Sequence, residues 1–101
     1  MERSAAPGAI SLRLAELGSC ARALAGERET LEGGELAAWR SRMDAWRQGA
    51  VAALLEAFEA EAAFEFIRAS HAAGRHGDRD AEVRSLRDAA ELLAVLNSTL
   101  D

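Results

Sequence analysis

The chain has 101 residues, a formal net charge of −5 at pH 7, a hydrophobic fraction of one half, and one cysteine. That length is enough for a single hydrophobic core, and one cysteine excludes an internal disulfide. The acidic balance argues against a nucleic-acid-binding protein, which needs a basic face to displace counterions.

Two features that the sequence lacks, a membrane-spanning segment and a signal peptide, indicate a cytoplasmic protein. No apolar run reaches the roughly 18–20 residues that a membrane-spanning helix needs. The N-terminal residues 1–7 also lack the apolar segment of a signal peptide. We therefore expect a cytoplasmic protein with no membrane insertion.

The composition predicts an all-α protein. Ala, Leu, Glu and Arg dominate, and only seven residues are β-branched. We expect an antiparallel helical bundle of three to four helices with one long central helix, which a second copy of the chain could complete. In this prediction residues 1–9 form a flexible N-terminal arm and residues 10–101 form one domain.

The first helix is expected over residues 10–26. Apolar residues recur there at steps of four and three, which places them on one face of a helix. They are Ile10, Leu14, Leu17, Ala21 and Leu24. Gly26 would end this helix, and residues 27–34, which close on Gly33 and Gly34, would connect it to the next.

The long helix is predicted over residues 35–73. One stripe of uncharged residues keeps the same spacing throughout, which favours a continuous helix. The stripe consists of Leu36, Trp39, Met43, Trp46, Ala50, Ala53, Ala57, Ala60, Phe64, Ile67 and His71. The alternative is two helices that meet near Gly49. Continuity is favoured because the spacing is preserved across Gly49 and no proline interrupts it.

A glycine-rich turn at residues 74–78 separates this helix from the last one. The last helix is predicted over residues 79–98, with Asp78 or Asp80 as its N-terminal cap. One face is apolar and would pack against the other helices. Its residues are Val83, Leu86, Ala90, Leu93 and Leu96.

The sequence contains little catalytic chemistry. His71 and His76, with Asp78 and Asp80, offer only a weak metal-site candidate, because nothing enforces ligand geometry. Cys20 is interpreted as a small thiol buried beside the first helix's stripe. No set of nucleophile, base and orienting residue is present, so we expect no enzyme, no cofactor and no bound metal.

Two groups of residues suggest binding instead. Trp39, Met43 and Trp46 share one stripe, and either pack on the first helix of the same chain or form a dimer or partner surface. Four glutamates, Glu56, Glu59, Glu61 and Glu65, form either a solvated helix face or a docking face for a basic segment.

From Leu54 onward the chain resembles the flagellin-specific export chaperone family. The matching elements are Leu54-Leu55, Phe66-Ile67, the Gly77-Asp78 turn, Ala89-Ala90 and Leu96-Asn97-Ser98-Thr99-Leu100-Asp101. Segments that look like the family's downstream part, Glu32 to Ala38 and Met43 to Trp46, stand upstream here. The resemblance implies a helical chaperone that binds a disordered segment of a secreted protein as amphipathic helices. It also implies a groove floor flanked by Phe58, Phe64 and Phe66.

The predicted function is therefore non-enzymatic protein binding. The first hypothesis is a cytosolic chaperone or adaptor that holds an amphipathic segment of a secreted, flagellar-type partner. The alternative is a self-associating helical regulatory or scaffold subunit, such as an antitoxin-like protein or a small inhibitor. The predicted partner-binding or dimer-interface residues are Leu36, Trp39, Met43, Trp46, Leu54, Phe58, Phe64 and Ile67.

Overall fold

The protein is all-α in the part of the chain that the computed structural model describes, which is residues 7–31, 33–71 and 79–100. Its four α-helices are α1 (Pro7–Thr30), α2 (Leu36–Ala57), α3 (Ala60–Ala69) and α4 (Arg79–Ser98). A short 3₁₀ turn, Gly33–Glu35, leads into α2. No strand occurs among these residues.

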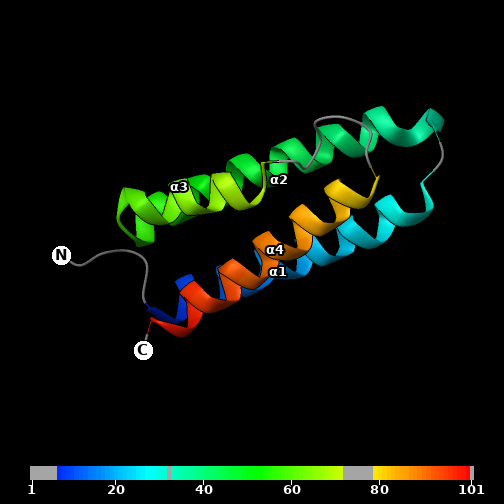
Figure 1. Ribbon diagram of the computed structural model, residues 1–101. Coiled ribbons are helices and arrows are strands. Elements are labelled where there is room, and N and C mark those ends of the chain that lie inside the picture. Colours follow the sequence, from blue (N-terminus) through cyan, green and yellow to red (C-terminus); the bar gives the residue numbers. More distant parts are fainter. Residues whose placement is uncertain (1–6, 32, 72–78, 101) are drawn as a thin grey trace.

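The helices pack along one another in an elongated body (Figure 1). Helix α1 lies beside α4 and α2, and α3 lies beside α2 and α4. The body measures 49 by 20 by 17 Å. Helix α1 begins, and α4 ends, at the same end of the molecule (Figure 1). Each helix thus packs along two others.

The core draws large side chains from every helix. The largest fully buried apolar ones are Trp39, Phe66, Leu14, Met43, Leu54, Leu86 and Leu93. Burying side chains of this size contributes about 1.5–3 kcal/mol each. The rings of Trp46 and Phe66 lie 5.4 Å apart at a 60° tilt, a geometry that aromatic pairs prefer. This contact joins α2 to α3.

The prediction of one helix over residues 35–73 is wrong. Helix α2 ends at Ala57, because Phe58 and Glu59 are extended, with ψ angles of 179° and 164°. Helix α3 then runs back along α2, so that the Arg47 Nη2 donates a hydrogen bond of 2.7 Å to the Ser70 carbonyl.

The position of Phe66 gives the physical reason for this reversal. In one continuous helix, Phe66 would stand about 30 Å from Trp46, at 1.5 Å per residue. The reversal instead brings their rings into contact inside the core. Gly49 lies within α2, so the alternative break at Gly49 is also wrong.

The ends of the other helices differ in how well the sequence predicted them. Helix α4 has the predicted bounds. Helix α1 begins at Pro7 rather than at residue 10, since a proline lacks only an N–H that the first turn leaves unpaired. It also continues past Gly26 to Thr30, which corrects the predicted stop. Residues 1–6 of the predicted arm and the predicted turn at 74–78 lie outside the described residues.

Candidate functional site

The tryptophan stripe belongs to the interior of the chain. Trp39 and Met43 have at most 1% of their surface exposed, and Trp46 has 7%. The Trp39 Nε1–H donates to the Leu24 carbonyl at 3.0 Å, and the Trp46 Nε1–H donates to that of Leu17 at 2.9 Å. Both carbonyls belong to α1, which confirms packing on the first helix of the same chain.

This packing places half of the predicted partner-binding set inside the chain. A residue that the chain's own helices enclose offers no surface to a partner. Trp39, Met43 and Leu54 are enclosed in this way. Leu36 and Phe58 are partly buried and pack against the core.

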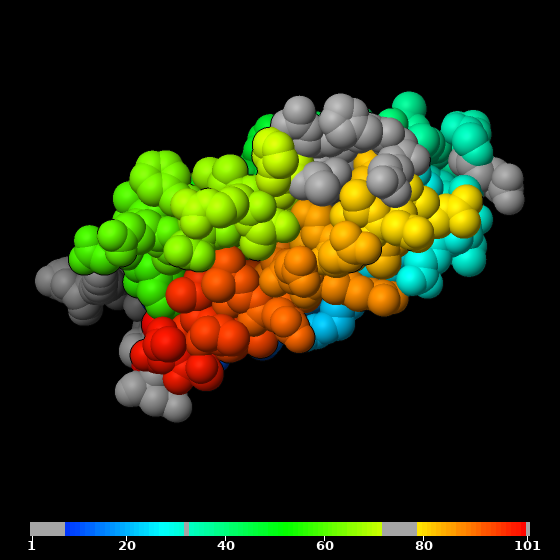
Figure 2. Space-filling view, viewed as in Figure 1, coloured from blue at the N-terminus to red at the C-terminus, as the bar shows by residue number. Residues whose placement is uncertain are grey.

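Phe64 and Ile67 are the two residues of the predicted set that are exposed. Phe64 is 60% exposed and Ile67 is 42% exposed. They lie three residues apart on α3, with Ala60 at helical spacing on the same exposed face. These three residues are called the α3 face below. In Figure 2, α3 lies on the viewed surface above α4.

Acidic side chains border the α3 face. Glu61 and Glu65 each follow a residue of that face by one position and are exposed. Residues 56–71 contain four glutamates and one arginine. That arginine, Arg68, has its Nη1 3.8 Å from the Glu65 Oε2 in an exposed pair. The α3 face is thus apolar with a negative border.

A second accessible apolar surface lies between α1 and α2. It is a groove of about 610 Å³, and the residues that line it are Ala9, Leu12, Arg13, Glu16, Leu17, Cys20, Arg42, Ala45 and Trp46. Leu12 stands out of it with 62% of its surface exposed. This surface is called the α1–α2 groove below.

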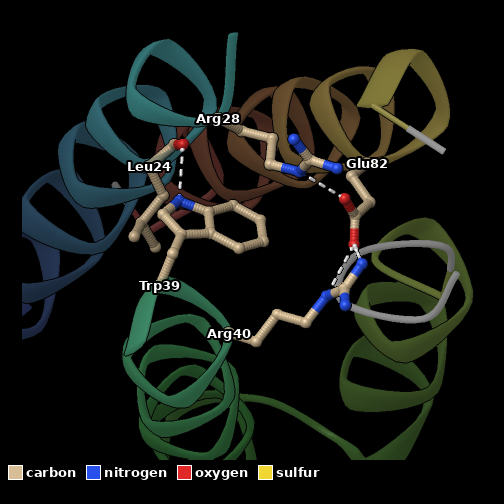
Figure 3. A network of polar contacts seen from close by, with 5 residues as sticks. All are labelled: Leu24, Arg28, Trp39, Arg40 and Glu82. Carbon is tan, nitrogen blue, oxygen red and sulfur yellow. Dashed lines mark hydrogen bonds and ion pairs between the residues drawn. The ribbon is translucent and has the colours of Figure 1, made fainter. Parts of the chain in front are cut away.

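A buried ion network joins α1, α2 and α4 inside the molecule (Figure 3). Glu82 of α4 is fully buried. Its Oε1 accepts a hydrogen bond from the Arg28 Nε of α1 at 2.5 Å. Its Oε2 accepts two from Arg40 of α2, from Nε at 3.3 Å and from Nη2 at 3.2 Å. The carboxylate therefore ties three helices together.

The network occupies the part of the molecule that α3 does not reach. The Ser85 Oγ donates to the Ala69 carbonyl, at the last residue of α3, with a distance of 2.7 Å. Glu82 precedes Ser85 by about one turn, so it lies beyond that end. The Arg28 guanidinium also lies 5.8 Å from the Trp39 ring centroid, within cation–π range.

The network's place indicates a structural role. All its charges are satisfied within the chain, and its carboxylate is closed to solvent, so a substrate has no access to it. Sequence reasoning missed Glu82. Its signal was an acid at helical spacing from Leu86 and Leu93, on the apolar face of α4.

The predicted thiol and metal candidates also need revision. Cys20 is exposed rather than buried, because it lies one position off the buried stripe, on the groove wall. Partial burial and the charge of Glu27 raise the pKa of its thiol, which disfavours the reactive thiolate. His71 is exposed, while His76 and Asp78 lie outside the described residues. The described residues hold no group of three metal-ligating side chains.

No family model matches the chain, and neither a curated protein nor a solved structure does. The resemblance to flagellin-specific export chaperones therefore stays a prediction. Within the described residues, every helix is too short or too polar to cross a membrane.

Proposed function

We propose that this protein binds a basic, amphipathic helical segment of a protein partner on the α3 face. One observation carries the proposal. Phe64 and Ile67 project from one face of a helix, with 60% and 42% of their surfaces exposed, next to the exposed glutamates Glu61 and Glu65.

The apolar residues set the shape of the partner. Side chains three and four residues apart on a helix form a ridge, and the apolar ridge of a second helix packs against it. An exposed aromatic residue is also a typical anchor of an interface, since its burial removes a large apolar area from water. An amphipathic helix supplies the matching apolar side.

The border sets the charge of the partner. Residues 56–71 hold four glutamates against one arginine, so an approaching segment meets a negative field. Lysines or arginines beside the partner's apolar face would lie next to Glu61 and Glu65. The function is therefore protein binding, without catalysis or a cofactor.

The rest of the molecule supports such a face. In this proposal the four helices form an antiparallel bundle that holds α3 rigidly, through the Trp46–Phe66 contact and the Arg47–Ser70 hydrogen bond. A cytoplasmic chaperone or adaptor for a secreted, flagellar-type protein would use this face to shield an amphipathic segment before export.

The test is a binding titration with two synthetic peptides. Both carry the same leucine face at helical spacing, and one has lysines and the other glutamates on the remaining positions. Fluorescence anisotropy of the labelled peptides should show binding of the lysine peptide only. The affinity should fall as salt is added, because salt screens the negative border.

Two variants make the test specific to the face. Phe64→Glu should weaken binding about tenfold or more, as expected for an anchor worth about 1.4 kcal/mol or more. Val95→Glu is the matched control, since Val95 is 59% exposed on α4. Each variant adds one negative charge, so non-specific attraction alone would strengthen binding to both. Equal binding by the two variants would overturn the proposal.

A further inference from the structure

We infer that two copies of this chain can exchange the unit formed by α3 and α4, with α2 and α3 of each copy joined into one continuous helix. The inference does not depend on the function proposed for the α3 face. It rests on the junction between α2 and α3, where the sequence is typical of a helix and the backbone is nevertheless bent.

The junction consists of two extended residues, Phe58 and Glu59. The sequence around it, residues 55–62, contains only leucine, glutamate, alanine and phenylalanine. The first three of these are strong helix formers. No side chain caps the N-terminus of α3, and the apolar spacing of α2 continues through the junction. Local preference therefore favours one helix over residues 36–69, and tertiary contacts hold the bend.

The backbone at the bend is close to helical. The Phe58 N–H donates to the Leu54 carbonyl at 2.8 Å, as in a helix. Glu59 has a φ of −73°, which is already a helical value, so straightening changes mainly its ψ and the two angles of Phe58. A straight helix would then gain the hydrogen bonds from the N–H groups of residues 59–62 to the carbonyls four positions earlier.

Straightening removes α3 from α2, so the contacts of α3 and α4 have to be made with another chain. A second copy supplies all of them. Trp46 of each copy would receive the Phe66 ring of the other. Arg28 and Arg40 would receive the Glu82 carboxylate of the other copy in the same way. An unrelated partner would not place a carboxylate between these two arginines, which selects a second copy as the occupant.

The position of the bend permits the exchange. It lies at the end of the elongated body where α1 begins and α4 ends (Figure 1). In a straight helix, residues 58–69 would project about 18 Å beyond the end of α2, at 1.5 Å per residue. The α3–α4 unit would then reach a second body placed at this end. Because each copy gives and receives the same unit, the pair is closed and two-fold symmetric.

Refolding at different protein concentrations tests the inference, because exchange requires α3 and α4 to leave their own chain. The wild-type chain is refolded from urea across a hundredfold concentration range, and its mass is then measured by light scattering at one common concentration. The fraction with twice the monomer mass of 10.8 kDa should rise with the concentration during refolding. A chain that is monomeric after every refolding would overturn the inference.

Two substitutions of the exposed Glu59 separate the bent form from the straight one. Glu59→Pro fits the bend, because proline requires a φ near −65° and an extended residue before it, which Phe58 is. A proline there would break a continuous helix. Glu59→Pro should therefore stay monomeric with an unchanged or higher melting temperature. Glu59→Ala removes the same charge and should dimerise at least as much as wild type. Equal dimer in the two variants would overturn the inference.

A mixture of two charge variants distinguishes an exchanged dimer from any other dimer. Arg28→Glu and Glu82→Arg each place like charges together in the network of their own chain. In an exchanged dimer of one copy of each, one half pairs the introduced glutamate with the introduced arginine, and the other half has the native pair. Refolding the two together should therefore give a dimer that melts at a higher temperature than either variant alone. A mixture no more dimeric and no more stable than the separate variants would overturn the inference, whether or not Glu59→Pro folds.

Discussion

Replacing Glu82 by methionine should destabilise the protein more than replacing any acidic residue on its surface. The substitution keeps the volume of the side chain and removes the acceptor of three hydrogen bonds from Arg28 and Arg40. Arg28 is only 5% exposed, so its charge would lose a carboxylate that water cannot replace. Breaking a buried pair in this way costs about 3–5 kcal/mol.

That loss is a large part of the stability of a chain this size, which is about 5–15 kcal/mol. Urea unfolding followed by circular dichroism measures it, and the melting temperature should fall by more than about 10 °C. Arg28→Met together with Glu82→Met should recover most of the loss, because the double change leaves no buried partner charge. Arg40 keeps 30% of its side chain exposed and can remain solvated.

Glu29→Met is the control for this prediction. Glu29 pairs with Arg87 at 2.9 Å, but both side chains are about half exposed. Losing an exposed pair costs about 0–1 kcal/mol. The structural role of the network would be refuted if Glu82→Met cost no more than Glu29→Met, or if the double substitution were as unstable as the single one.

The remaining predictions concern packing, helix propensity and pH. Leu93→Ala should cost about 2–5 kcal/mol in urea unfolding, whereas Val95→Ala should cost less than about 0.5 kcal/mol, because Leu93 is fully buried and Val95 is exposed. Gly49→Ala should stabilise the fold by about 0.5–1 kcal/mol, since a Cβ there would meet no atom within 4 Å inside a helix; a destabilised variant would contradict this. The hydrogen bond from Arg42 lowers the pKa of Glu27 below its usual 4.5, so the pair stabilises the fold above that pH and loses its effect as pH falls through the lowered value. The melting temperatures of wild type and Glu27→Gln should therefore converge on acidification, and a gap that persists in acid would argue against the pair.

Local signals were sufficient to predict the last helix. Residues 79–98 follow a glycine-rich stretch of sequence and carry acids in the first helical turn, and their apolar spacing is regular, so the bounds of α4 were correct. The first helix was predicted too short at its C-terminal end. Gly26 is a local stop signal, yet the helix continues to Thr30, and Glu27 and Arg28 beyond that glycine form ion pairs with α2 and α4.

The reversal between α2 and α3 could not be predicted from local signals. The residues around Phe58 and Glu59 include no glycine or proline, and no side chain caps the N-terminus of α3. Tertiary packing of Phe66 on Trp46 decides the break. This break in the helix also explains why the predicted stripe is buried in α2 but exposed in α3. Two extended residues shift the helical phase, so the stripe that buries Trp39 and Trp46 exposes Phe64 and Ile67.

The most direct test of the account is a map of where the lysine peptide binds. Two-dimensional amide spectra of the ¹⁵N-labelled protein, recorded during a titration with this peptide, report each backbone position. The account predicts shifts along α3, centred on Phe64 and Ile67, with the signal of Leu12 unmoved. Shifts centred on the α1–α2 groove, or no shifts at saturating peptide, would contradict it.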